Sequence, residues 1–233
     1  MSIEARRQTA VELLRAAVRE HGPVVQANSL GAEDVVLTDL AWTEVPEIEI
    51  FTLDTGRLHE QTLNLIERLE NRYQRRMKVY QPDAAALEAW VAGNGINGFY
   101  NSVEQRHGCC GIRKIQPFKR AIAGAGAWIT GVRREQSATR ALAAPVEVDE
   151  ANGGIARISP LLDWTNDEVW NYIRARKLPY NPLHDQGYPS IGCAPCTRAV
   201  QPGEDSRSGR WWWENSSKEC GLQPRQRGTA TAG

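Results

Sequence analysis

The sequence predicts an α/β fold with a mainly parallel sheet flanked by helices, followed by a mobile C-terminal tail. Short apolar segments that suit buried strands alternate with longer segments in which apolar residues recur every three or four positions. Polar or glycine-containing turns separate the first strands from the helices after them. Such alternation is typical of parallel strands joined by helical crossovers. After Arg225 there is no apolar periodicity, which indicates a disordered end.

The first third of the chain contains the clearest predicted elements. An amphipathic helix is expected over residues 9–20, because Ala10, Leu13, Leu14, Ala17 and Val18 share one face, and Gly22 and Pro23 end it. Two strand–turn–helix units follow, with strands at 24–27 and 48–53, turns at 28–31 and 54–56, and helices at 33–41 and 59–72. A further strand is expected at 77–80.

The remaining predicted elements are shorter. Helices are expected at 84–91 and at 112–123, where Pro117 should kink or restart the second one, so that Cys109 and Cys110 precede a helix. A strand is expected at 128–131, and segments 145–148 and 155–158 suit a small hairpin. The sequence Thr165-Asn166-Asp167-Glu168 is a capping box that opens a helix towards Arg176. The Pro- and Gly-rich stretch after Leu178 should be an ordered loop held by something other than secondary structure, such as a metal site.

Composition excludes several classes of partner. The 233 residues include 28 Lys plus Arg and 28 Asp plus Glu, so the formal net charge is zero and there is no footprint for nucleic-acid or acidic-membrane binding. The N-terminus lacks the apolar core of a signal peptide, and no run of about eighteen apolar residues occurs. We expect a soluble cytoplasmic protein with one globular domain.

The five cysteines divide into four and one. Cys109 and Cys110 are adjacent, Cys193 and Cys196 form a CxxC, and Cys220 stands alone. A CxxC and a distant second pair can complete a four-thiolate site, and adjacent cysteines suit the separate iron corners of a [4Fe–4S] cluster better than one zinc ion. Structural zinc and buried free cysteines remain open alternatives on spacing alone.

Two turns and several basic residues are candidates for binding an anion. Ser29 to Asp34, with Gly31 at its centre, lies between a predicted strand and helix, and Asp54 to Gly56 follows the next strand. Either turn can also be an ordinary β–α connection, and Asp54 can be only a helix cap. The basic candidates are Arg113, Lys114, Arg133, Arg134, Arg140 and Arg198.

Cys220 lies in a stretch that suits a mobile nucleophile. It follows three consecutive tryptophans and precedes the predicted disordered end. A thiol on such a tail can attack a bound substrate and then meet a reductant, although an incidental surface thiol fits the same position.

Taken together, these motifs resemble the APS/PAPS reductase family of sulfate assimilation. The resemblance runs from about residue 24 to 223 and rests on SLGAEDVVL at 29–37, LDTGRL at 53–58, CCGIRK at 109–114, GVRREQSATR at 131–140, SPLLDWTNDEVW at 159–170, GCAPCTR at 192–198 and KECGL at 218–222. It implies an adenine nucleotide alpha hydrolase-like fold in residues 1–205, which would bind the sulfonucleotide and an iron–sulfur site. Residues 206–233 would form the tail that carries the nucleophile.

The resemblance also assigns roles. Cys220 would attack the substrate sulfur to give an S-sulfocysteine, which thioredoxin or a glutaredoxin-like reductant would cleave to sulfite. Cys109, Cys110, Cys193 and Cys196 would hold a [4Fe–4S] cluster. Substrate-binding residues would be Ser29, Gly31, Asp54, Gly56, Arg113, Lys114, Arg133 and Arg198.

The four cysteines favour adenylyl sulfate (APS) over its 3′-phosphorylated form (PAPS), since family members with both pairs generally use APS. Gln223 departs from the family pattern, which has His after Gly-Leu, so an acid–base role is not expected there. Rival functions are a PAPS or dual-specificity reductase, a non-catalytic zinc- or cluster-binding regulator, and a nucleotide-transferring relative of the same fold. The sequence leaves open whether the chain forms a homo-oligomer.

Overall fold

The structure is a computed structural model that describes residues 2–137 and 140–214. The helices are α1 (Ile3–His21), α2 (Ala32–Glu44), α3 (Glu60–Tyr73), α4 (Ala84–Asn94), α5 (Val103–Cys110), α6 (Gln116–Ala121) and α7 (Asn166–Ala175). The strands are β1 (Val24–Asn28), β2 (Glu49–Leu53), β3 (Lys78–Tyr80), β4 (Ala127–Ile129), β5 (Val146–Asp149) and β6 (Ile155–Ile158).

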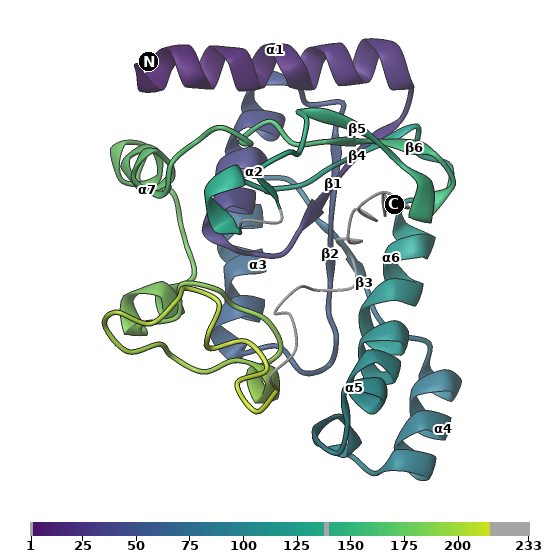
Figure 1. The fold of residues 1–233 in the computed structure, drawn as a ribbon. Coiled ribbons are helices and arrows are strands. Elements are labelled where there is room, and N and C mark those ends of the chain that lie inside the picture. The colour runs from purple at the N-terminus through teal and green to yellow at the C-terminus, as the bar shows by residue number, and fades with distance from the viewer. Residues whose placement is uncertain (1, 138–139, 215–233) are drawn as a thin grey trace, which may run out of the picture.

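These strands form one six-stranded sheet in the order β3-β2-β1-β4-β6-β5 (Figure 1). Every neighbouring pair is parallel except β5 and β6, which pair antiparallel with Val146 opposite Ile158. The chain therefore runs outward from β1 to β3 and then returns to the other side of β1 with β4. Ligands of open α/β sheets bind where the strand order reverses in this way, outside the carboxyl ends of the strands.

Helices cover both faces of the sheet, with α1, α2, α3 and α7 on one face and α6 on the other (Figure 1). Consecutive residues of β1 point to opposite faces, so Val24 joins the larger core and Val25 joins the smaller core with Phe118 and Trp128. Both faces of the sheet are covered at its centre, so β1, β2 and β4 are mostly buried along their length, whereas the edge strands β3 and β5 are mostly exposed. The predicted α/β class with a mainly parallel sheet is confirmed.

The helix at the vicinal cysteines differs from the prediction. It begins at Val103, where the Ser102 side chain accepts a hydrogen bond from the Gln105 N–H, and it continues through a π-helical turn at Gly111–Ile115 into α6. Cys109 and Cys110 therefore end α5 instead of preceding a helix. Pro117 lies where the π-helical turn passes into α6, and its missing N–H removes one hydrogen bond at this change of helical form.

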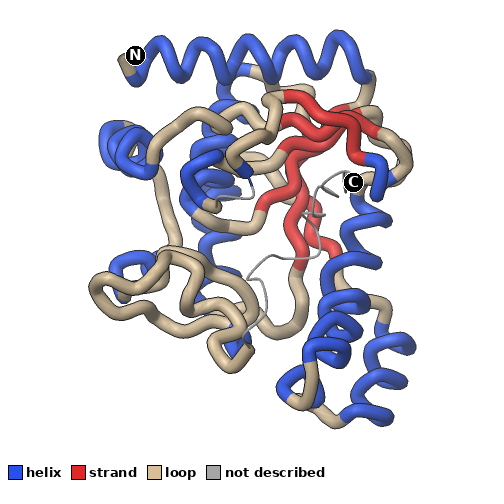
Figure 2. The backbone as a smooth tube through the Cα atoms, viewed as in Figure 1, coloured by secondary structure: helices blue, strands red, loops and turns tan. Residues whose placement is uncertain are grey.

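The later predictions agree with the structure. The Thr165–Glu168 capping box is formed in both directions and starts α7. After α7 the chain is mostly loop, drawn in tan in Figure 2, with short 3₁₀ turns at Pro182–Gln186 and Ala194–Cys196. Within residues 2–137 and 140–214, none of the helices is long and apolar enough to cross a membrane.

Candidate active site

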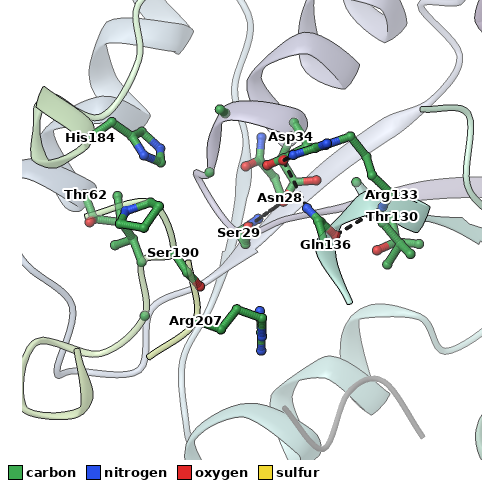
Figure 3. A pocket seen from close by; sticks show the side chains of 18 of the residues that line it. Asn28, Ser29, Asp34, Thr62, Thr130, Arg133, Gln136, His184, Ser190 and Arg207 are labelled. Carbon is green, nitrogen blue, oxygen red and sulfur yellow. Dashed lines mark hydrogen bonds and ion pairs between the residues drawn. The ribbon is translucent and has the colours of Figure 1, made fainter. Parts of the chain in front are cut away.

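A cavity of about 770 Å³ opens at the carboxyl ends of β1, β2 and β4, where the strand order reverses. One wall is the turn after β1, a second is the segment after β4, and a third is the loop after α7. Figure 3 shows side chains from all three walls pointing towards the shared space. Segments more than a hundred residues apart in sequence thus meet at the position that the fold class favours for ligands.

The turn after β1 is held by its own side chains. Leu30 has a left-handed backbone with φ of 63°, and its N–H donates to Asn28 Oδ1 at 2.6 Å. Asp34 Oδ2 accepts from the Ser29 N–H at 2.7 Å and from Ser29 Oγ at 2.6 Å. Burial raises the pKa of Asp34 to about 6. The Asp34 carboxylate therefore bonds to the turn after β1 and fixes the backbone that precedes α2.

Glu33, the acidic residue next to Asp34, forms an ion pair with the buried Arg133. Arg133 Nη2 lies 2.9 Å from Glu33 Oε1, and Arg133 Nη1 lies 2.7 Å from Glu135 Oε2. Gln136 Nε2 also donates to Glu33 Oε1 at 3.0 Å. The negative charge that would oppose an anion at this turn is thus neutralised by the segment after β4.

The third wall comes from the loop after α7. His184 Nδ1 lies 2.8 Å from the Tyr188 carbonyl, which can only accept, so Nδ1 carries the proton and the pKa of His184 is lowered by burial. Arg210 reaches the cavity with Nη1 3.3 Å from the Ile191 carbonyl. A Cβ on Gly192 would lie 2.4 Å from Arg210 Nη2, so glycine leaves the space that the guanidinium occupies. Arg207 lines the same wall.

The four cysteines gather around a second, smaller cavity of about 20 Å³ next to the first. Cys109 and Cys196 are buried, and Cys193 Sγ lies 3.2 Å from Thr55 Oγ1. Burial, together with the charges of Cys193 and Cys110, raises the pKa of Cys196 to about 12, and Lys114 opposes that shift. Within the described parts of the chain, no group of three or more His, Cys, Asp or Glu side chains is arranged to hold a single metal ion.

Lys114 joins the two cavities. It lines the larger cavity together with the Ser29 turn, and it lines the smaller one together with all four cysteines. It follows Cys110 by four residues, so one helical turn carries it from the thiols to the strand ends. The adjacent Arg113 takes a different direction and donates from Nη1 to the Thr55 carbonyl at 2.5 Å.

The predicted substrate-binding residues fall into two groups. Ser29, Gly31, Lys114 and Arg133 line the larger cavity. The others lie outside its lining: Asp54 accepts from the Gly56 N–H at 2.8 Å, Arg113 lies beside the cysteines, and Arg198 pairs with Glu204 at 2.9 Å. Cys220 and Gln223 lie outside the described residues.

Sequence reasoning missed much of the lining, namely Asn28, Thr62, Thr130, Gln136, Trp170, Arg174, His184, Ser190, Arg207 and Arg210. Asn28 ends β1 and Thr130 directly follows β4, the two neighbouring strands at the switch point, so the strand pattern could have indicated them. Arg207 and Arg210 lie in an irregular loop with no periodic signal. Together with Ser206, they also show that residues 206–214, which we assigned to the tail, pack against the domain.

The strand order and the flanking helices define an α/β fold of the adenine nucleotide alpha hydrolase-like class, with the cavity at its switch point. The model of the phosphoadenosine phosphosulfate reductase domain matches residues 23–199, and the chain belongs to that family. The predicted family and the oxidoreductase class are thereby confirmed.

Named relatives cover most of the chain. The adenosine 5′-phosphosulfate reductase of Allochromatium vinosum is 54% identical over 97% of this chain and 88% of its own length. The enzyme of the same name from Burkholderia cepacia is 53% identical over 90% of this chain and 84% of its own length.

Solved structures support the same fold. The phosphoadenylyl-sulfate reductase of Candida auris, solved as a phosphate complex, superposes with a TM-score of 0.70 at 27% identity and covers 85% of this chain and 96% of its own. The FMN adenylyltransferase of Candida glabrata, solved with FAD and inorganic pyrophosphate, shares only the fold, with a TM-score of 0.58 at 17% identity over 91% of this chain and 74% of its own.

Proposed function

We propose that this protein reduces adenylyl sulfate to sulfite and AMP in assimilatory sulfate reduction. Relatives that are more than half identical carry the name adenosine 5′-phosphosulfate reductase, and this chain has the two cysteine pairs that favour APS. The observation that carries the proposal is Lys114, which lines both the nucleotide-sized cavity and the four-cysteine cavity. One cation thereby links the substrate site to the cysteines.

The reaction uses thiols for both electrons. The Cys220 thiolate attacks the sulfur of APS, an S–S bond forms, and the S–O bond to the phosphate breaks, so that AMP leaves with the bonding pair. A thioredoxin thiolate then attacks the Cys220 sulfur and releases sulfite, and the second thioredoxin thiol resolves the mixed disulfide. One SO₃ unit is reduced by two electrons and one dithiol is oxidised to a disulfide.

The cavity residues stabilise the charge that this reaction moves. Negative charge grows on the departing phosphate as the S–O bond breaks, and Lys114, Arg207 and Arg210 line the space around it. The Ser29 and Leu30 N–H groups are already bonded to Asp34 Oδ2 and Asn28 Oδ1, so the turn contributes through the N-terminus of α2, where the helix dipole favours an anion. Arg113 acts as a positioning residue, since it holds the turn through the Thr55 carbonyl.

We further propose that Cys109, Cys110, Cys193 and Cys196 hold a [4Fe–4S] cluster. Their side chains reach one small cavity from two distant segments of the chain, which gives the four sulfur ligands that such a cluster needs. When bound, the cluster would tie α5 to the 193–196 turn and contribute to the field at Lys114. It is not the electron donor in the scheme above.

Parallel turnover assays with APS and PAPS test the proposal, with thioredoxin or dithiothreitol as reductant. APS reduction that is lost in Cys220→Ser supports it. The rival, a PAPS reductase, is favoured by the family match and by the Candida auris structure, and preferential turnover of PAPS would establish that function instead. A non-catalytic regulator would bind AMP and turn over neither substrate.

A further inference from the structure

The last described residue of the chain, Glu214, is held by an ion pair deep inside the protein. Arg106 Nε donates to Glu214 Oε1 at 2.9 Å, and Arg106 Nη2 donates to Glu214 Oε2 at 2.8 Å. The two side chains are only 3% and 4% exposed. This is a bidentate pair between groups 108 residues apart in sequence, on α5 and on the segment that leads to Cys220.

The Trp211 ring packs next to this ion pair. Two guanidinium groups lie over the Trp211 ring, with Arg106 Cζ 4.6 Å and Arg210 Cζ 4.7 Å from its centroid. Trp211 is 2% exposed, has a left-handed φ of 42°, and donates its backbone N–H to the Cys196 carbonyl at 3.1 Å. A non-glycine residue holds that strained backbone only when its surroundings fix it. Residues 210–214 are therefore pinned to the four-cysteine region.

Stability alone does not account for the buried pair. Removing two charges from water offsets most of their attraction, and apolar residues of similar size are often as stable in their place. A bidentate pair instead fixes one geometry, because a planar guanidinium meets a carboxylate in a single orientation. The geometry it fixes here is the exit point of the chain, six residues before Cys220.

We propose that the Arg106–Glu214 pair is the anchor that positions Cys220 for attack, an inference that rests on the proposed function. Six residues span at most about 20 Å, so a fixed Glu214 sets the greatest distance at which the Cys220 thiol can act. Arg210, four residues earlier, lines the cavity, which places the anchor beside the site that the thiol must reach. Arg106 and Glu214 are positioning residues, since they act through the tether and do not touch the substrate.

The test uses variants that remove the anchor without leaving a buried charge. In Arg106→Met/Glu214→Gln both charges are gone, so the protein should stay folded. Either single change would leave one buried charge without its partner. The matched control is Arg157→Met/Glu147→Gln, which removes another partly buried pair, at 2.8 Å between β6 and β5. A third variant carries a Gly-Ser-Gly insertion directly after Glu214.

The measurement is the single-turnover rate at which Cys220 gains the mass of SO₃ at saturating APS, together with the dissociation constant of AMP. We expect the anchor variant and the insertion each to slow this rate, measured per iron-loaded protein because Arg106 also lines the four-cysteine cavity, about tenfold with AMP affinity unchanged. The reason is that a thiol that is less well placed has a lower effective concentration. Combining the two changes should add little, since both release the same constraint. The control pair should react at the rate of the unchanged protein, and Arg106→Lys should recover part of the loss.

Several results overturn the inference. An anchor variant that reacts as fast as the unchanged protein shows that the pair does not position the thiol. A parallel loss of AMP affinity, or fully multiplicative effects of variant and insertion, shows that the pair acts on the fold or the cavity instead. If the unchanged protein turns over APS or PAPS but never acquires SO₃ on Cys220, the proposed function itself fails.

Discussion

Arg133 and Glu33 form an ion pair with an N–O distance of 2.9 Å inside the larger cavity, and their side chains are 5% and 19% exposed. The pair joins the turn after β1 to the segment after β4 across the switch point of the sheet. Arg133 is thus committed to two carboxylates of the protein, Glu33 and Glu135, before any ligand arrives. Arg133 therefore offsets the negative charge of Glu33 and Glu135 in the wall of the cavity.

This relationship predicts the behaviour of two variants. Arg133→Met should weaken AMP binding by about tenfold, because it leaves the Glu33 carboxylate unpaired in a cavity that must hold an anion. Glu33→Gln/Arg133→Met should recover much of that affinity, since the uncompensated charge is gone. Isothermal titration with AMP measures both, and a double variant as weak as the single one would show that Arg133 contacts the nucleotide directly.

Lys114 should be essential for the chemical step. We expect Lys114→Met to lower the single-turnover rate by about a hundredfold, the scale found when one preorganised electrostatic partner of a transition state is removed. Lys119→Met, an exposed lysine on α6, is the matched control and should change the rate little. If Lys114→Met mainly weakens AMP binding and leaves the rate at saturation unchanged, the lysine serves binding alone.

Asp34 should make stability depend on pH. Its folded-state pKa is raised to about 6, above its unfolded value of about 4, so the native state holds its proton more tightly. The stabilisation is fully present below about pH 4 and is lost as pH rises through about 6. Relative to Asp34→Asn, the unchanged protein should therefore lose about 1 kcal/mol of unfolding free energy between pH 5 and 7.

Urea unfolding at the two pH values measures this difference. The exposed Asp167→Asn variant is the control and should track the unchanged protein over the same range. If the difference in unfolding free energy between Asp34→Asn and the unchanged protein stays constant from pH 5 to 7, the pKa of Asp34 is not raised in the folded state.

The cofactor prediction concerns colour and iron. Protein purified without oxygen should show broad visible absorbance and bind iron and sulfide, and Cys193→Ser should lose both, since each thiolate holds one iron corner. Elemental analysis and absorption spectra check this. Colourless protein that contains zinc would refute the cluster, and a colourless Cys193→Ser variant with full activity would remove its role in the reaction.

Much of the fold could be predicted because its signals are local. Apolar strand runs, the turns after them and the Thr165–Glu168 capping box each depend on a few neighbouring residues. The start of α5 was missed because Val103–Cys110 has no apolar face of helical period, and the Ser102 cap and the packing of the 3₁₀ turn at Gly98–Tyr100 support it instead.

Site residues could be predicted only where they lie next to a recognisable strand, turn or cysteine motif in the sequence. Ser29, Gly31, Lys114 and Arg133 stand directly after structured landmarks and do line the cavity. Arg207 and Arg210 could not be found, because their place depends on how an irregular loop folds back over the sheet. Asp54 and Arg198 show the opposite case. Each looks like a substrate-binding residue in the sequence but instead bonds to a nearby residue of the chain, Gly56 and Glu204 respectively.

Two glycines limit how this cavity can be redesigned. A Cβ at position 131 would lie 2.6 Å from Asp34 Oδ1 and 2.7 Å from Glu33 Cβ, and a Cβ at 192 would strike the Arg210 guanidinium. The width of the cavity at these two places is thus set by backbone rather than by side chains. A directed-evolution library aimed at new nucleotides should hold both positions constant and vary Trp170 and Arg174 on α7, where side chains alone form the wall.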